Sequence, residues 1–329
     1  MHNGGLFLGI DTSNYTTSAA LCDRAGQVIA NLKAPLPVKD GACGLRQSDA
    51  VFAHVKNLPG LMEQLRGVLG APTFADCGIE AVGVSATPRD AEGSYMPCFL
   101  TGVAAASSIA AVLDVPIYTF SHQNGHIRAA LYSSGHTGEL AGHPFGAFHV
   151  SGGTTEVLYV EPARVGFRVT LVGETGDINA GQAIDRVGVM LGLHFPCGPA
   201  LERLAAENHR KVPGFAVSVK DCVCHLSGLE NMADKLYRET GDRALVADFV
   251  LRFIGKTLCR MTEQLLEKYP GLPVLYAGGV MSNRYLQTLL SSKFTSYFAE
   301  PAFSADNAAG VSLLCREAHL GAGEGRHAG

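Results

Sequence analysis

Two histidines four residues apart are the clearest candidates for chemistry in this sequence. His122 and His126 open a segment, residues 122–132, that is predicted to be a helix. Side chains four residues apart share one helix face, so both imidazoles could bind one metal ion. A third ligand would come from elsewhere, and Asp306 is the candidate because it ends a polar stretch before an apolar segment. The alternatives are exposed or capping histidines and, for Asp306, an ordinary helix N-cap.

A carboxylate ends the first predicted strand. Asp11 closes the apolar run 6–11 and precedes the hydroxyl-rich loop 12–16. A carboxylate at this point could hold a metal-bound water beside a phosphate, or act as a base. It could equally be a turn residue that accepts hydrogen bonds from backbone amides.

A second polar loop follows another predicted strand, residues 146–150. It consists of Ser151-Gly152-Gly153-Thr154-Thr155. The glycines allow close approach of a ligand to the backbone, and the hydroxyls can bond oxyanions. Farther along, Gly278-Gly279 separates a predicted strand from a helix over 282–291, capped by Ser282 or Asn283. This arrangement brings backbone close to a ligand at a helix N-terminus, although the glycines could simply close a tight turn.

Two carboxylates bracket the start of a helix predicted over residues 180–191. They are Asp177 and Asp185, eight positions apart. Asp185 could form a plain surface ion pair with Arg186, or it could bond a ribose or another substrate hydroxyl.

The elements that must position these residues form two similar sets. The pattern strand, polar loop, strand, strand occurs twice, roughly 140 residues apart. The expected strands are 6–11, 17–22, 27–32, 79–85, 115–120, 146–150, 156–160, 166–172 and 274–277, and the expected helices also include 50–69 and 99–113. Pro59 is expected to break or kink the first helix. Duplicated halves suit a protein that holds phosphates between two lobes, and two ordinary hairpins are the alternative.

Composition limits the class of protein. The 329 residues, 47% hydrophobic and 17% charged, are enough for two well-buried domains. A net charge of −4 gives no overall basic footprint, so an RNA substrate would need a local positive patch or a partner protein. Nine cysteines and no signal peptide indicate a reducing cytoplasm, and no stretch is suited to a membrane. The sequence holds no Walker A motif, HExxH motif or nucleophile elbow, so a zinc peptidase has no support.

Eight segments in register across nearly the whole chain resemble one family, the tRNA N6-threonylcarbamoyladenosine transferases, formerly called glycoproteases. The segments are Leu8–Ser13, His122–His126, Val150–Gly153, Gly173–Asp185, Leu191–Pro199, Leu226–Leu229, Ala277–Arg284 and Asp306–Ala308. The resemblance implies an α/β fold of the duplicated actin/sugar-kinase/chaperone-ATPase type. Its expected domains are an N-terminal lobe over 1–140, a C-terminal lobe over 141–320 and a flexible, disordered tail over 321–329.

The resemblance also implies a reaction and its site. A threonylcarbamoyl group would pass from threonylcarbamoyl-AMP to N6 of adenosine 37 in tRNA. One divalent metal, iron or zinc, would be held by His122, His126 and Asp306, and Asp11 would be catalytic. The adenylate, or an ATP- or AMP-type nucleotide, would bind between the lobes at His149, Val150, Ser151, Gly152, Gly153, Asp185, Gly198 and Asn283. The expected protein partners are an inactive paralogue and a small ATPase.

This sequence departs from the family pattern in its loops. Asp11-Thr12-Ser13-Asn14-Tyr15 replaces the family's Glu-Thr-Ser-Cys-Asp, and Thr154 replaces the histidine of its SGGHT loop. With the metal triad intact and these loops altered, the chain has the features of a diverged paralogue. Two alternatives to the family reaction therefore stay open: another carbamoyl- or nucleotide-dependent transferase, and a non-catalytic partner of a tRNA-modifying complex.

Overall fold

The fold was determined as a computed structural model that describes residues 5–13, 15–37, 45–304 and 308–324. Contacts divide the chain into two compact units. The first contains the described residues of 1–133, 162–168 and 305–329, and the second contains 134–161 and 169–304. The predicted lobes divide the chain differently, because the segment after residue 305 belongs with the first unit.

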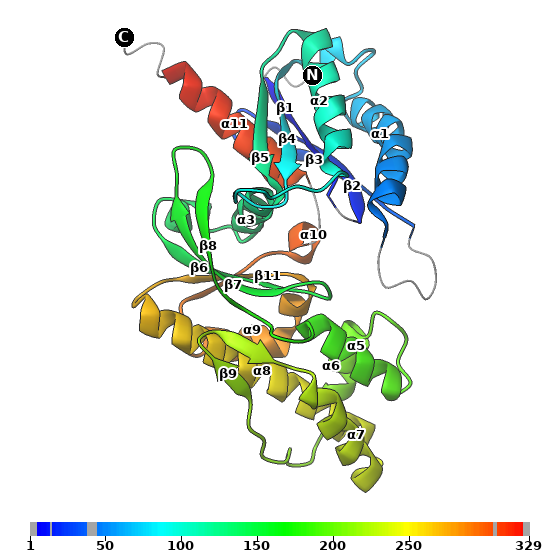
Figure 1. The fold of residues 1–329 in the computed structure, drawn as a ribbon, viewed down its shortest axis with the longest axis vertical. Helices are drawn as coiled ribbons and strands as arrows, with labels where there is room; N and C mark the ends of the chain where they lie inside the picture. Colours follow the sequence, from blue (N-terminus) through cyan, green and yellow to red (C-terminus); the bar gives the residue numbers. More distant parts are fainter. Residues whose placement is uncertain (1–4, 14, 38–44, 305–307, 325–329) are drawn as a thin grey trace. The chain divides into compact units, whose positions relative to one another are not determined.

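The first unit is a five-stranded sheet with helices on both faces. Its elements are β1 (Leu6–Asp11), β2 (Thr16–Asp23), β3 (Val28–Pro35), α1 (Gln47–Leu69), a 3-10 turn (Ala75–Cys77), β4 (Ile79–Thr87), α2 (Phe99–Leu113), β5 (Ile117–Ser121), α3 (His122–Ser133) and α11 (Ala309–Glu324). Helices α1 and α2 pack on one face, and α11 packs on β1, β2 and β4 from the other (Figure 1). The contacts of α11 with these strands and with α3 explain why the C-terminal segment joins this unit.

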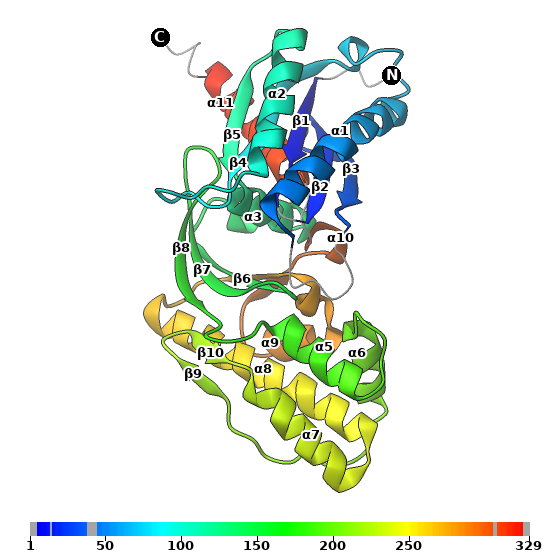
Figure 2. The ribbon, with the colours of Figure 1, turned by 45° about the vertical axis from the view of Figure 1, so that its right-hand side comes forward.

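The second unit is also built on five strands. Its elements are α4 (Thr137–Leu140), β6 (Phe145–Val150), β7 (Thr155–Pro162), β8 (Phe167–Glu174), α5 (Ala180–Met190), α6 (Gly198–Ala206), β9 (Ser218–Lys220), β10 (Val223–His225), α7 (Gly228–Thr240), α8 (Arg243–Lys268), β11 (Val274–Ala277), a 3-10 turn (Gly279–Ser282), α9 (Arg284–Ser291), β12 (Ser296–Phe298) and α10 (Pro301–Ser304). Figure 2 shows α5, α6, α7 and α8 together on one side of this sheet. The central helix α8 packs on α5, α6, α7 and α9 and forms much of the core.

The two sheets have the same strand order, which confirms the predicted repeat. The first runs β3-β2-β1-β4-β5, and the second, taken in the matching direction, runs β8-β7-β6-β11-β12. In each, the first strand of the set pairs antiparallel with the strand that follows it in sequence, β1 with β2 and β6 with β7. In each it also pairs parallel with a later strand, β1 with β4 and β6 with β11. The polar loops after β1 and β6 therefore occupy equivalent positions in the two units.

Two local expectations were wrong. Helix α1 continues through Pro59 without a break, because Leu58, Leu61 and Leu65 bury its inner face in the core of the first unit. The tail was expected to be disordered over residues 321–329, whereas α11 continues to Glu324, and residues 325–329 lie outside the described residues. Within the part of the chain that the structure describes, no helix is both long and apolar enough to cross a membrane.

Candidate active site

The carboxylate of Asp11 is fully buried at the end of β1 and is surrounded by polar groups. Its Oδ1 accepts a hydrogen bond from the backbone N–H of Ser13 at 2.7 Å. Its Oδ2 accepts one from Oγ of Ser85, on the neighbouring strand β4, at 2.8 Å, and lies 2.7 Å from Nδ1 of His122. A buried carboxylate needs such partners because an unpaired buried charge is costly. Asp11 thus holds the turn after β1 and contacts the histidine pair as well.

His122 and His126 lie in the first two turns of α3, and the structure brings their rings together. The ring centroids are 4.2 Å apart and the ring planes meet at 74°. The edge of Phe99, at the start of α2, lies against His122 with 6.1 Å between ring centroids. The shared helix face expected from the four-residue spacing is therefore present.

The start of α3 is held in place by Asn124, a buried residue that sequence analysis did not single out. Its Oδ1 accepts from the backbone N–H of Phe167 at 2.7 Å, and its Nδ2 donates to the carbonyl of Phe167 at 3.0 Å. A Cβ on Gly310 of α11 would clash with the carbonyl oxygen of Gly125. Only glycine permits so close an approach, so α3 and α11 lock together beside the histidines.

The histidine pair suits a metal in the chemistry of its donors. A histidine that ligates a metal usually bonds its other ring nitrogen to a carboxylate, which fixes the orientation of the ring. The contact of Nδ1 of His122 with Asp11 has this form, so a metal would be bound through Nε2. Asp306 lies outside the described residues, and among those described no group of three or more His, Cys, Asp or Glu side chains is arranged to hold a metal. The metal and its full ligand set therefore stay a prediction.

In the second unit, the loop after β6 is a tight turn packed on a helix. Oγ of Ser151 accepts hydrogen bonds from the backbone N–H groups of Gly153 and Thr154. The carbonyl of Ser151 accepts from the N–H of Gly181, in the first turn of α5, at 3.1 Å. A Cβ on Gly181 would lie 2.6 Å from the backbone nitrogen of Gly152. The loop backbone thus rests directly on the N-terminus of α5.

Replacing Gly181 with alanine is expected to push the loop 151–154 away from α5. The added methyl group meets backbone atoms, which cannot rotate away as a flexible side chain could. Overpacking of this kind costs about 1–3 kcal/mol in the free energy of unfolding. Urea denaturation would measure this loss, and Gly138→Ala, at a helical position where a Cβ has no neighbour within 4 Å, is the matched control. Equal stability of Gly181→Ala and the parent would contradict the close packing.

An open cavity of about 470 Å³ lies beside this loop in the second unit. It brings together four of the predicted binding residues: Gly152, Asp185, Gly198 and Asn283. Gly279 and Ser282, from the predicted strand–glycine–helix unit, also lie in its wall. Other residues in its wall were not predicted: Gly181, Ile184, Pro196, Pro199, Glu202, Leu251 and Val280. Because α6 begins at this cavity, its N-terminal N–H groups favour a bound anion. The first N–H groups of α5 are already bonded to Thr155, Ser151 and Asn179. Nothing in the sequence spacing links Gly181 or Glu202 to the site, since only the fold brings them there.

The polar residues of the cavity also make structural hydrogen bonds. Oδ1 of Asp185 accepts from the backbone N–H of Cys197 at 2.7 Å, and Oε1 of Glu202 accepts from that of Arg284 at 2.8 Å. Oδ1 of Asn283 accepts from the N–H of Leu286 at 3.0 Å, so Asn283 is the N-cap of α9, one of the two caps expected. Asp185 and its neighbour Arg186 were alternatively expected to form an ion pair. Arg186 instead forms an ion pair with Glu230 at 3.4 Å.

The remaining predicted binding residues do not line this cavity. Val150 is buried, His149 is half-buried on β6, and Ser151 and Gly153 lie in the turn itself. Their assignment to a ligand remains a prediction.

Asp177 has a structural task away from the cavity. Its carboxylate accepts hydrogen bonds from the backbone N–H groups of Leu226 and Ser227, just before α7, and from that of Ile178. Burial alone would raise the pKa of Asp177, but these hydrogen bonds outweigh it and hold the pKa well below its usual range. Asp177 therefore anchors the start of α7.

The depressed pKa of Asp177 predicts an acid-sensitive contribution to stability. A lowered folded-state pKa stabilises the protein above the unfolded pKa, about 3.9, and this stabilisation is lost as pH falls further. We expect Asp177→Asn to lower the free energy of unfolding by about 1 kcal/mol at neutral pH. The difference from the parent should shrink below about pH 4. Urea denaturation of Asp177→Asn and the parent at neutral pH and below about pH 4 tests this prediction. A difference in free energy of unfolding that does not change with pH would contradict it.

The sequence of this chain is similar to known proteins over most of its length. Residues 44–313 match the family model described as tRNA N6-adenosine threonylcarbamoyltransferase. The enzyme of that name from a strain of Thermus thermophilus is 32% identical over 320 residues, 95% of this chain and 92% of the relative. The one from Halalkalibacterium halodurans is 30% identical, covering 92% and 85%.

Solved structures support the fold. The (R)-2-hydroxyglutaryl-CoA dehydratase component A of Acidaminococcus fermentans superposes with a TM-score of 0.54 at 13% identity, covering 96% of this chain and 99% of that one. A ROK family glucokinase from Streptomyces griseus, in complex with glucose and AMPPNP, gives 0.52 at 13% identity, covering 94% and 98%. The predicted actin/sugar-kinase fold class is confirmed. With the family model matching most of the chain and relatives alike over nearly their whole length, this protein belongs to the tRNA N6-adenosine threonylcarbamoyltransferase family of transferases.

Proposed function

We propose that this protein transfers the threonylcarbamoyl group of threonylcarbamoyl-AMP to N6 of adenosine 37 in tRNA. The observation that carries the proposal is the similarity to a family relative over 95% of the chain, in a fold that pairs the two histidines of α3. In this reaction N6 attacks the carbamoyl carbon, the bond from that carbon to the phosphate oxygen breaks, and AMP leaves as N6 loses a proton.

The cavity beside α5 and α6 is the proposed site of the adenylate. Its volume, about 470 Å³, lies within the range usual for small-molecule sites. The N-terminal N–H groups of α6 would bind the phosphate. One oxygen of Asp185 is held by Cys197, which fixes the carboxylate for a hydrogen bond to a ribose hydroxyl. The glycine, proline and aliphatic residues that line the cavity would exclude water from the adenine base of the adenylate.

The histidines of α3 are the proposed metal ligands, together with Asp306. Iron or zinc bound there would supply Lewis-acid polarisation of the carbamoyl carbonyl. Asp11 is buried and hydrogen-bonded to Ser13 and Ser85, so its proposed task is to orient His122 and not to touch the substrate. The proposed partners are tRNA, an inactive paralogue and a small ATPase. The proposed location is the reducing cytoplasm, which suits the eight described cysteines, all free thiols.

Transfer of labelled threonine onto unmodified tRNA tests the proposal. The reaction would contain this protein, the adenylate-forming enzyme and the partner proteins of its own organism, with an active family member as the positive control. We expect incorporation that disappears in His122→Ala and Asp306→Ala. No incorporation, with the family member active in the same mixture, would reject the proposal in favour of a transferase with another acceptor or a non-catalytic partner.

A further inference from the structure

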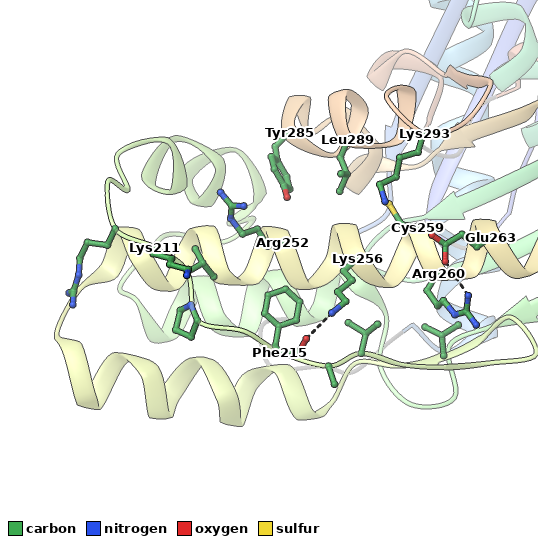
Figure 3. Close-up of a pocket in the computed structure, with 16 residues that line it drawn as sticks. Lys211, Phe215, Arg252, Lys256, Cys259, Arg260, Glu263, Tyr285, Leu289 and Lys293 are labelled. Atoms are coloured by element: carbon green, nitrogen blue, oxygen red, sulfur yellow. Dashed lines mark hydrogen bonds and ion pairs between the residues drawn. The ribbon is translucent and has the colours of Figure 1, made fainter.

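A groove of about 890 Å³ on the second unit gathers basic side chains from three separate segments (Figure 3). The segments are the stretch 210–219, helix α8, and α9 with the residue shortly after it. The basic residues are Arg210, Lys211, Arg252, Lys256, Arg260 and Lys293. Glu263 is the one acidic residue among the sixteen described residues that line the groove. On a chain of net charge −4, this is a local concentration of positive charge.

Helix α8 presents its cations in a row. Arg252, Lys256 and Arg260 are exposed and four residues apart, so successive charges are about 6 Å apart along the helix. The positions between them, such as Phe253 and Leu258, are buried in the core. The row is therefore a polar stripe on an otherwise buried helix, and its line of charges matches a chain of phosphates better than a single anion.

The arginines of the groove are partly neutralised by surface ion pairs. Arg252 pairs with Asp248 at 2.8 Å, and Arg260 with Glu263 at 3.1 Å and with the more distant Glu267 at 3.7 Å. Arg210 pairs with Asp242 at 3.3 Å in the same way. All three arginine side chains are about half exposed, and ion pairs of exposed arginines contribute little stability.

Three lysines have no carboxylate partner among the described residues. Lys211, in the stretch 210–219, and Lys293, just after α9, are exposed, and neither has a described ion pair. Nζ of Lys256 donates to the carbonyl of Phe215 at 2.8 Å and lies 5.1 Å from the centre of that ring. Arg252 lies in a similar position over Tyr285, at 5.9 Å. Three lysine charges in the groove could therefore bind an anion, and they lie next to two half-buried aromatic rings.

The groove is open along its length. Among the described residues that line it, only Cys259 is buried. A pocket for a small molecule encloses most of its ligand, whereas a polyanion is held on an open basic surface. An acidic protein would also be complementary in charge to this groove, but the regular spacing of the cations on α8 favours a phosphate backbone.

We infer that this groove, which shares no lining residue with the adenylate cavity, binds the phosphate backbone of tRNA. The inference rests on the proposed function in that tRNA is the acceptor. Contacts to phosphates fix the position of a nucleic acid without recognising its sequence. The groove would therefore supply the local positive field that RNA binding requires of an acidic chain, and it would act on tRNA affinity and not on the chemical step.

The test is the variant Lys211→Gln/Lys256→Gln/Lys293→Gln, titrated into fluorescently labelled unmodified tRNA. Each lost phosphate contact reduces the magnitude of the slope of log K against log salt by about 0.7–0.9, so the loss of three should reduce it by about 2 to 3. The dissociation constant should rise about tenfold at physiological salt, for any tRNA sequence. In the transfer assay KM for tRNA should rise while kcat at saturating tRNA stays unchanged. Because Lys256 also bonds Phe215, the double variant of Lys211 and Lys293 should show about two thirds of the slope change.

The control removes three cations from the same unit outside the groove, as Lys235→Gln/Arg238→Gln/Arg243→Gln, all exposed residues. It should bind tRNA like the parent. The inference is overturned if the control weakens binding as much as the groove variant, or if the parent fails to bind tRNA. Unchanged binding by the groove variant also overturns it and makes an acidic protein the occupant to test. Groove-dependent binding by a parent that transfers nothing would reject the proposed function and leave this inference standing.

Discussion

Replacement of His122 by alanine should strip the purified protein of its metal and lower threonylcarbamoyl transfer by about a thousandfold or more. A metal that polarises a carbonyl contributes several kcal/mol, and about 1.4 kcal/mol corresponds to a tenfold change in rate. The ring of His122 lies 4.2 Å from that of His126, so the loss of either should disrupt a shared ligand set. Elemental analysis of the protein, alongside the transfer assay, measures both effects.

The matched control is His143→Ala, because His143 is exposed in the second unit and plays no part in the pair. It should keep the metal content and activity of the parent. Loss of activity in His122→Ala with metal content unchanged would show that His122 is not a ligand. Absence of metal from the parent as well would remove the metal from the proposal and favour the non-catalytic alternative.

Replacement of Asp11 by asparagine should cost about 10–100-fold in metal affinity or in activity, while the protein stays folded. Asparagine keeps the size of the side chain and one oxygen for the N–H of Ser13, but the carboxylate that faces Nδ1 of His122 is lost. The ring would then be free to turn, and a ligand that is not held in orientation binds its metal less tightly. Metal affinity measured by competition with a chelator, together with kcat, tests the prediction.

These two readouts separate the roles open to Asp11. A base in contact with the substrate would lose kcat without losing metal, whereas a residue that orients His122 loses both together. Asp49→Asn, at an exposed position in the first turn of α1, is the control for the loss of one carboxylate. Parent-like metal affinity and kcat in Asp11→Asn would contradict the orienting role.

The sequence predicted the repeated strand pattern well, because each strand after the polar loops is a short apolar run bounded by turn residues. It predicted no helix or strand between residues 192 and 273, where the structure has α6, β9, β10, α7 and α8. Helix α8 has buried residues at 250, 254, 258 and 261, a helical spacing that could have been found. The break expected at Pro59 does not occur, because packing of the apolar face of α1 outweighs the loss of one backbone hydrogen bond.

What the sequence determined by itself was the family, the class of fold and the helix face that the two histidines share. The spacing of His122 and His126 is enough to put them on one face, because a helix repeats every 3.6 residues. Motifs in register gave the family, since the same residue types recur in the same order along the chain.

Only the tertiary structure decided which residues meet. Asp11 and His122 are 111 positions apart, and they touch because α3 begins where β5 ends, two strands along the sheet from β1. Glu202 and Gly181 reach the cavity, and Lys211 and Lys293 the groove, because packing around α8 brings distant segments together. Such contacts depend on burial of apolar faces across the whole unit, and spacing along the chain does not record them.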